Sequence, residues 1–139
     1  ILSDTGMIEY LRARHRDGAV VLGLSAGSIM LAREWVRWPD PQHPERAERF
    51  ACLDLAPLWC DTHGEDDDWE ELRALLALLP PDSTGYGIPS GVTLRIDSNG
   101  HAEALGGPIH RFHRGLKHVR RIADLQPLRP AQAPAGGPA

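Results

Sequence analysis

The chain has little of what marks several classes of protein. Two cysteines, Cys52 and Cys60, are too few for a disulfide scaffold, and we interpret both as reduced, in a cytoplasmic protein. No apolar run approaches the roughly 20 residues that span a bilayer. The N-terminal residues include Asp4 and Glu9 and lack the n-region and h-region of a signal peptide. These absences argue against a disulfide-rich secreted protein and against a membrane protein.

A strong basic excess is also missing. The formal net charge is -4 and the basic residues are scattered, which argues against nucleic-acid binding and against a membrane-surface role. The 139 residues, 42% of them apolar, suffice for one domain with its own core. We predict a domain over residues 1–123 and a disordered tail of proline, alanine and glycine over residues 124–139. Because Ile1 is not a translation start, we expect the upstream part of this domain to be missing.

The most informative stretch is an apolar run that ends in small residues. Residues 19–24 have strand character, Gly23-Leu24-Ser25-Ala26-Gly27 follows, and a helical pattern occupies residues 28–36. This order of strand, G-x-S-x-G turn and helix is typical of a nucleophile elbow. The turn strains the serine backbone, and we expect Gly23 and Gly27 to supply the room for it. The N–H of Ala26 would then face a developing oxyanion. The alternative is a tight turn with an N-capping serine.

The rest of the chain predicts a mixed α/β domain. A helix to about Arg16 precedes the elbow, and three prolines within residues 39–44 predict an irregular loop after it, followed by a short helical turn in residues 45–50. The acidic run at residues 65–68 leads into an amphipathic helix over residues 69–79. We predict strands at residues 53–60, 84–88, 92–96, 102–105, 109–113 and 115–122, with a hairpin turn at residues 97–100.

The elbow strand suggests how these elements are layered. It is apolar on both faces, which is typical of a central parallel strand covered by helices on both sides. We therefore predict an α/β fold in which a parallel sheet is flanked by helices and carries C-terminal antiparallel hairpins. The chain would be the C-terminal part of a larger domain.

His63 is the candidate partner of Ser25. It follows the predicted strand at residues 53–60 and precedes the helix at residues 69–79, and active sites of α/β folds form at this edge. There it would take the Ser25 proton as a general base. A histidine on a surface loop is the alternative.

Several motifs together resemble a known family. They are Gly23-x-Ser25-Ala26-Gly27, the later His63, and a closing pattern, Gly87-Ile88-Pro89-x-Gly91, Ser98-Asn99-Gly100 and Leu105-Gly106-Gly107-Pro108. Over about residues 1–115 the chain resembles peptidase family S51, the serine peptidases that include dipeptidase E and cyanophycinase. The resemblance implies a class I glutamine amidotransferase-like fold and hydrolysis of small peptides or amide-linked amino acids. No cofactor is implied.

The resemblance also assigns catalytic residues. In the dipeptidase branch the order is serine, aspartate, histidine, which falls here on Ser25, Asp40 and His63. The family's glycine-rich loop, which helps to form the oxyanion hole, would lie upstream of this sequence. The cyanophycinase branch takes its acid from a glutamate at the place where this chain has Ser90.

Other acids compete with Asp40. Asp40 would orient the imidazole of His63 and stabilise its protonated form, or it would be an Asx-turn residue among prolines. Asp61, Glu65 and Asp68 lie close to His63 in the sequence, and for them we favour helix capping and compensation of the helix dipole.

We do not predict a metal site. His63-Gly64-Glu65 imitates the H-x-E of zinc deaminases, but the required P-C-x-x-C is missing. His110 and His113 would point to opposite faces of a strand. Cys60 has no elbow around it and reads as a buried strand cysteine.

Three functions remain open from the sequence. The first is a serine peptidase or amidase that uses Ser25, His63 and Asp40 on a small peptide or amide substrate. The second is a non-catalytic module that keeps the fold for binding or assembly, as a homo-oligomer or with an upstream segment. The third is an acyl-transfer enzyme of a biosynthetic pathway. The residues that would bind the substrate are not indicated.

Overall fold

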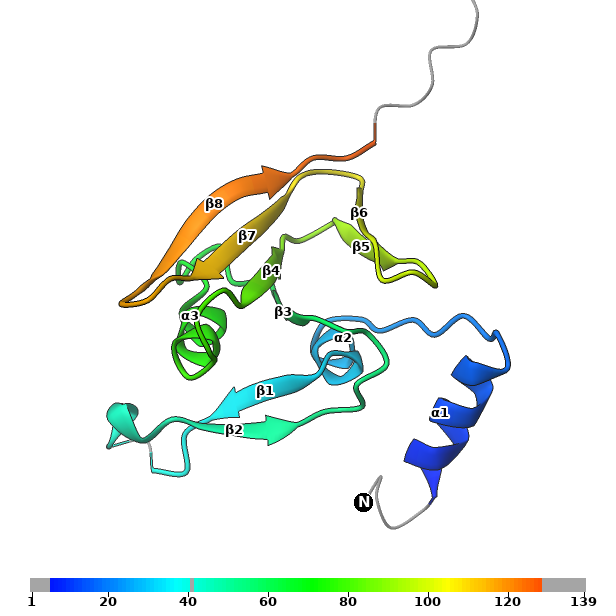
Figure 1. Cartoon of the computed structure of the whole chain (residues 1–139), viewed down its shortest axis with the longest axis horizontal. Coiled ribbons are helices and arrows are strands. Elements are labelled where there is room, and N and C mark those ends of the chain that lie inside the picture. Colours follow the sequence, from blue (N-terminus) through cyan, green and yellow to red (C-terminus); the bar gives the residue numbers. More distant parts are fainter. Residues whose placement is uncertain (1–5, 41, 129–139) are drawn as a thin grey trace, which may run out of the picture.

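The computed structural model describes residues 6–40 and 42–128. The elements follow one another along the chain as shown in Figure 1. They are α1 (Met7–Arg16), α2 (Ala26–Leu31), β1 (Glu34–Arg37), the 3-10 helix η2 (Pro44–Arg46), β2 (Glu48–Ala51), β3 (Trp59–Thr62), α3 (Glu70–Ala77), β4 (Thr84–Ile88), β5 (Thr93–Ile96), β6 (Ala102–Leu105), β7 (Ile109–Arg114) and β8 (Val119–Leu125). The chain is therefore a mixed α/β protein.

A four-stranded sheet forms the centre of the molecule. Its strand order is β3-β4-β7-β8. Strands β3 and β4 are parallel, with Thr62 opposite Ile88 as the last pair of their register. The β4–β7 and β7–β8 pairs are antiparallel. Two separate hairpins, β1–β2 and β5–β6, complete the strands.

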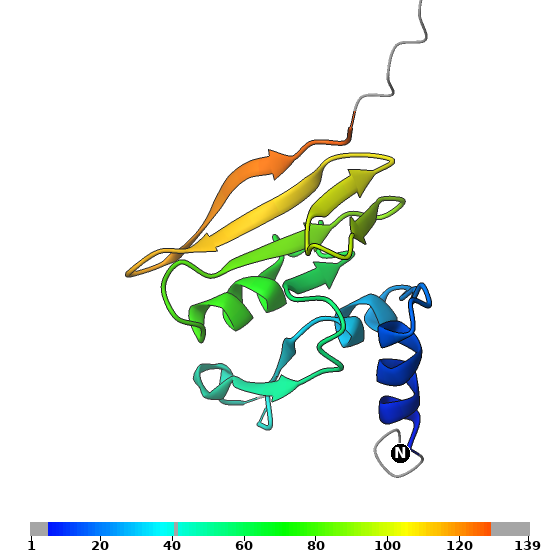
Figure 2. The same cartoon turned by 45° about the vertical axis from the view of Figure 1, so that its right-hand side comes forward.

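Helix α3 lies between this sheet and the β1–β2 hairpin (Figures 1 and 2). Leu72 and Leu76 are one turn apart and fully buried, and they form one core cluster with Phe112 of β7. Leu75 points to the other side and packs with Trp35 and Val36 of β1. A short helix with two buried faces thus joins the sheet to the hairpin.

The opposite face of the sheet carries a second core. Ala32, next to the end of α2, clusters with Cys60 of β3, Ile88 of β4, Ala104 of β6 and Ile109 of β7. Side chains of the β5–β6 hairpin cover part of this face. Helix α1 contributes no buried residue, although the Arg12 guanidinium donates to the Leu53 carbonyl at 3.3 Å.

Much of the predicted secondary structure is confirmed. The helix that ends at Arg16, the amphipathic helix before Pro80 and the strand at residues 84–88 are present. The 97–100 turn closes the β5–β6 hairpin, because the Gly100 N–H donates to the Asp97 carbonyl at 3.0 Å. The Asp97 carboxylate also accepts from the Asn99 and His101 N–H groups.

The apolar run at residues 19–24 is not a strand. Within residues 6–40 and 42–128 no strand pairs with it, and Val20, Leu22 and Leu24 are 86%, 84% and 88% exposed. Apolar character favours burial in a sheet, but a strand forms only against a neighbour that accepts its backbone hydrogen bonds. The parallel sheet that we predicted around the elbow strand is therefore absent from the described residues, in which the strands that pair in parallel are β3 and β4.

Three further boundaries differ from the prediction. The helix after the turn ends at Leu31 instead of Val36, because residues 34–37 pair with β2 and Trp35 and Val36 enter the core. Only Trp59–Thr62 of the strand predicted at 53–60 is extended in the sheet, after the Ala56-Pro57 segment. The short helical turn predicted in residues 45–50 is limited to η2.

The ordered region also extends beyond residue 123. Strand β8 continues to Leu125, and Pro127 forms an isolated bridge with Ala104. Residues 124–128, which we assigned to the tail, thus belong to the folded part, whereas the remainder of the predicted tail lies outside the described residues. In the described part of the chain, no helix has the length and apolar character needed to cross a membrane.

We expect Leu76→Ala to lower the free energy of unfolding by about 2–5 kcal/mol, because it leaves a cavity between α3 and the sheet. Leu78→Ala is the matched control, since Leu78 is 40% exposed next to the same helix, and it should cost less than about 1 kcal/mol. Urea unfolding followed by circular dichroism measures both. Equal losses in the two variants would contradict this account of the core.

Candidate active site

Ser25 lies in a strained turn immediately before α2. Its φ of 51° and ψ of -127° are unusual for a residue with a side chain. The Gly27 N–H donates to the Leu24 carbonyl at 2.9 Å, and the Ser28 N–H donates to the Ser25 carbonyl at 2.8 Å. The sharp turn and the helix of the predicted elbow are thus present, but the strand before them is not.

Gly23 is required by close backbone packing in this turn. A Cβ at Gly23 would lie 2.5 Å from the Gly27 carbonyl oxygen. The Ser28 hydroxyl donates to the Gly23 carbonyl at 2.8 Å and holds the two ends of the turn together. A Cβ at Gly27 would meet open space, so the prediction that Gly27 also supplies room is wrong.

His63 directly follows β3, where the parallel pair β3–β4 ends. Its N–H donates to the Ile88 carbonyl at 3.3 Å, which extends the β3–β4 pairing by one residue. Its φ of 61° turns the chain out of the sheet. The side chain consequently lies at the carboxyl edge of two parallel strands, where α/β folds place their sites.

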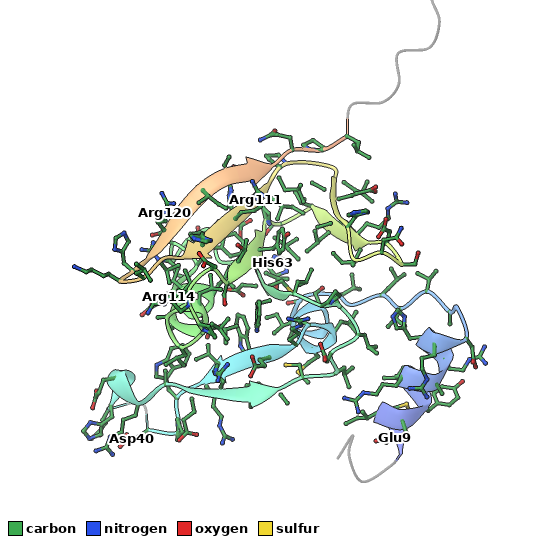
Figure 3. The ribbon with its side chains drawn as sticks, in the orientation of Figure 1. Glu9, Asp40, His63, Arg111, Arg114 and Arg120 are labelled. Carbon is green, nitrogen blue, oxygen red and sulfur yellow. The ribbon has the colours of Figure 1, made fainter. Side chains whose placement is uncertain are left out.

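Ser25 and His63 line the same cavity, which has a volume of about 640 Å³. The two residues reach it from α2 and from β3, and Leu24, Ile88 and Val92 contribute apolar walls. Figure 3 shows His63 at the centre of the molecule, beside β4. The cavity brings a strained serine and a histidine to one space large enough for a small substrate.

A serine that the sequence left unassigned contacts His63. Ser90 lies in the turn after β4, which is closed by a 3.1 Å hydrogen bond from the Val92 N–H to the Pro89 carbonyl. Gly91 has a φ of 77°, which this turn needs at its third position. The Ser90 hydroxyl oxygen lies 3.0 Å from the His63 Nδ1.

Glu65 contacts Ser90 through its carboxylate. Its carboxylate accepts the Ser90 N–H at 2.5 Å. This backbone hydrogen bond is the main reason that the Glu65 pKa lies below its usual value, with smaller contributions from the Ser90 hydroxyl and from the charge of His63. Partial desolvation opposes the shift. We expected Glu65 to cap a helix, and the structure instead directs it to the neighbour of His63.

Asp40 is not brought to His63. Figure 3 shows it beyond the end of β1, well away from His63. Its carboxylate accepts the Gln42 N–H at 3.0 Å and lies 3.9 Å from His43 Nε2. This is the Asx turn that we considered as the alternative. Because residues 34–37 pair with β2, the loop after them is carried away from the edge where His63 lies.

The remaining acids near His63 have structural partners. Asp68 pairs with Arg73. Asp67 caps α3, since its Oδ1 accepts the Trp69 N–H at 3.0 Å and the Glu70 N–H at 3.4 Å. Asp61 is 5% exposed, and its carboxylate accepts the Thr62 N–H at 2.7 Å.

The surroundings of Asp61 disfavour its charged form. Its pKa is raised to about 6, mainly by burial and to a smaller extent by the nearby Glu71 and Asp67 carboxylates, whereas N–H bonds from Thr62 and Leu72 oppose the shift. These neighbours lie on or just before α3, on the side of β3 away from the cavity that Cys60 and Thr62 line. Asp61 therefore does not serve the Ser25 cavity.

Cysteine and metal chemistry receive no support from the geometry. Burial raises the pKa of the Cys60 thiol to about 12, so the thiol stays protonated near neutral pH. In residues 6–40 and 42–128, no three His, Cys, Asp or Glu side chains are grouped so that they could hold a metal ion. His110 contacts Asp124, whereas His113 contacts Asp82 and Thr84, so the two do not share a site.

Comparison with known proteins gives one match. The sequence model of peptidase family S51 matches residues 1–104 of the chain. No curated protein and no solved structure matches the chain significantly. The matched region contains Ser25, His63 and Ser90.

The raised pKa of Asp61 predicts how stability depends on pH. The folded chain holds the Asp61 proton up to about pH 6, whereas the unfolded chain releases it near 3.8. The folded state therefore binds more protons in this interval, and the free energy of unfolding falls as pH rises through it. Asp61→Asn should remove this decrease. The free energy of unfolding of the variant, relative to wild type, should therefore be higher at pH 7.5 than at pH 3 by up to about 3 kcal/mol.

Urea unfolding of both proteins at several pH values measures the difference. Asp66→Asn is the matched control, because Asp66 is an exposed acid of the same run. Parallel stability curves for wild type and Asp61→Asn would show that Asp61 titrates alike in the folded and unfolded chain.

Proposed function

The chain belongs to peptidase family S51, and we propose that it is a serine-type peptidase or amidase that forms an acyl-enzyme on Ser25. The observation that carries the proposal is the cavity shared by Ser25 and His63. Family membership supports a peptidase-type hydrolase, and the strained backbone of Ser25 supports its role as nucleophile. The substrate would be a small peptide or amide, and the reaction needs no cofactor.

The proposed reaction uses the two nitrogens of His63 differently. Nδ1 faces Ser90, so Nε2 accepts the Ser25 proton while the Ser25 Oγ attacks the substrate carbonyl carbon. The C–N bond then breaks, and the departing amine takes the proton from Nε2. Water repeats the sequence on the acyl-enzyme: Nε2 takes a proton from the water as its oxygen bonds the acyl carbon. The bond between the acyl carbon and the Ser25 Oγ then breaks, Oγ takes the proton back from Nε2, and the acid product leaves.

The oxyanion that forms in both steps needs hydrogen-bond donors. The Ala26 N–H follows Ser25 directly, and we propose it as one of these donors. The backbone angles of Ser25, φ 51° and ψ -127°, support this role, because together they set the direction of the peptide group that carries the Ala26 N–H.

An assembly role is the second candidate, and one observation favours it. Val20, Leu22 and Leu24 expose more than four fifths of their surface along one extended segment, and such a row of apolar side chains is typical of a contact surface. The two candidates differ in one measurement. Only an activated serine reacts rapidly with a fluorophosphonate probe, whereas a binding module does not need one.

We expect the fluorophosphonate to label wild-type protein at Ser25 and to leave Ser25→Ala unlabelled. Once a substrate is known, the variant should lose on the order of 10⁶-fold in turnover, since the nucleophile and its base act together. Peptide mapping by mass spectrometry locates the adduct. Ser83→Ala, which changes a serine outside the cavity lining, is the control and should label normally. Turnover of Ser25→Ala within about tenfold of wild type, with unchanged circular dichroism, would remove Ser25 from the mechanism.

We expect Asp40→Asn to change the labelling rate less than about threefold, because its carboxylate holds a local turn away from His63. His63→Ala should instead reduce labelling by about 10²-fold or more, the usual contribution of a general base. Initial rates of probe incorporation measure both variants. A loss for Asp40→Asn as large as that for His63→Ala would place Asp40 beside His63 in the active form.

A further inference from the structure

The His63 ring contacts the hydroxyl group of Ser90, and Ser90 in turn contacts the Glu65 carboxylate. The Ser90 oxygen lies 3.0 Å from Nδ1, and the Glu65 carboxylate accepts the Ser90 N–H at 2.5 Å. We propose that Ser90 is a positioning residue for His63 and that Glu65 supplies the negative charge through it. The inference rests on the proposed function of Ser25 and His63.

The hydrogen-bond directions follow from which nitrogen must be free. A base that accepts the Ser25 proton on Nε2 carries its own proton on Nδ1. The Nδ1–H then donates to the Ser90 oxygen, and the Ser90 O–H is free to donate in turn. The Glu65 carboxylate, which already accepts the Ser90 N–H at 2.5 Å, is the acceptor that we propose for this O–H.

The negative charge of Glu65, at the end of this series of hydrogen bonds, has a catalytic consequence. When Nε2 takes the Ser25 proton, the imidazole becomes positively charged, and an anion nearby lowers the energy of that state. Glu65 is an anion near neutral pH, since its pKa lies below the usual value. No proton passes through Ser90: the proton on Nδ1 stays there throughout, and only the Ser25 proton moves.

The fold holds the two ends of this contact rigidly. His63 is bound to β4 through its N–H, which donates to the Ile88 carbonyl. Ser90 is two residues after Ile88, in a turn that Gly91 and the Val92-to-Pro89 hydrogen bond fix. Both residues are therefore attached to the same end of β4, and little conformational freedom remains to be lost when the contact forms.

The other acids of this region do not compete for the position. Asp61 accepts the Thr62 N–H and lies on the α3 side of β3. Asp68 pairs with Arg73, and Asp40 lies beyond β1. Among these acids only Glu65 contacts Ser90, the neighbour of His63, which makes it the source of charge.

The test uses the full chain and three readouts. They are the rate of fluorophosphonate labelling at Ser25, the separate kcat and KM once a substrate is found, and the ¹⁵N shifts of the His63 ring, assigned with His63→Gln. We expect Ser90→Ala to slow labelling by about ten- to a hundredfold, the range expected for loss of a hydrogen bond to a group that becomes charged. The same variant should reduce kcat with little change in KM, and it should shift the ring nitrogens toward the tautomer with the proton on Nε2.

Matched variants separate positioning from general damage. Ser90→Thr keeps the hydroxyl and should restore both labelling and tautomer, whereas Ser83→Ala changes a serine outside the cavity lining and should alter neither. Glu65→Gln removes the charge and should slow labelling by about tenfold, with Asp66→Asn as its control. If Glu65 acts on His63 through Ser90, the double variant of Ser90→Ala and Glu65→Gln should be labelled no more slowly than Ser90→Ala alone.

The outcomes distinguish this inference from the proposed function. Normal labelling and an unchanged tautomer in Ser90→Ala would overturn the positioning role while Ser25 remained the nucleophile. Multiplicative losses in the double variant would overturn the link from Ser90 to Glu65. Absence of labelling in the wild type would overturn the proposed function, and a tautomer change in Ser90→Ala would still support the contact between Ser90 and His63.

Discussion

The parallel pairing of β3 with β4 is the contact on which the candidate site depends. Parallel strands leave a sheet at the same edge, so the residues that follow them meet there. Thr62 lies opposite Ile88 as the last pair of the two strands. His63 directly follows Thr62, and Ser90 is two residues after Ile88. A slip of one residue would turn every side chain of β3 to the other face. The packing of β4 against β7 and of α3 against both strands opposes such a slip.

The two halves of the site are held by different forces. His63 and Ser90 are fixed by a sheet with a buried core on both faces. Ser25 is fixed by short-range contacts within its own turn, the close approach of Gly23 to Gly27 and the hydrogen bond from Ser28. The strained serine backbone persists because these contacts over-determine the turn. The apolar segment that enters the turn has no strand beside it in the described chain, and its side chains remain exposed.

The acidic residues around His63 show how tertiary structure divides similar side chains among different tasks. Asp67 caps α3, Asp68 pairs with Arg73, and Asp61 is buried with a raised pKa. Glu65 alone turns toward the edge where Ser90 lies. All four lie within eight residues, from Asp61 to Asp68. Their roles follow from which face of β3 or which turn of α3 each one reaches. The sequence pattern of the segment predicts a helix whichever role each acid has, so the pattern alone does not separate these roles.

The sequence by itself determined the features that depend on near neighbours. The leucine spacing of α3, the Asp97–Gly100 turn and the need for a small residue at Gly23 all act over a few positions, and each was predicted. Tertiary structure decided whatever needs a partner far along the chain. Residues 19–24 had the composition of a strand but no strand beside them in the described part of the chain, and residues 34–37 paired with β2 instead of extending a helix. The family resemblance assigned Asp40 to His63 and gave Ser90 no role, yet Ser90 is the residue that shares the sheet edge of His63. The physical reason is that a hydrogen bond between residues 27 positions apart exists only after two strands have paired in one register.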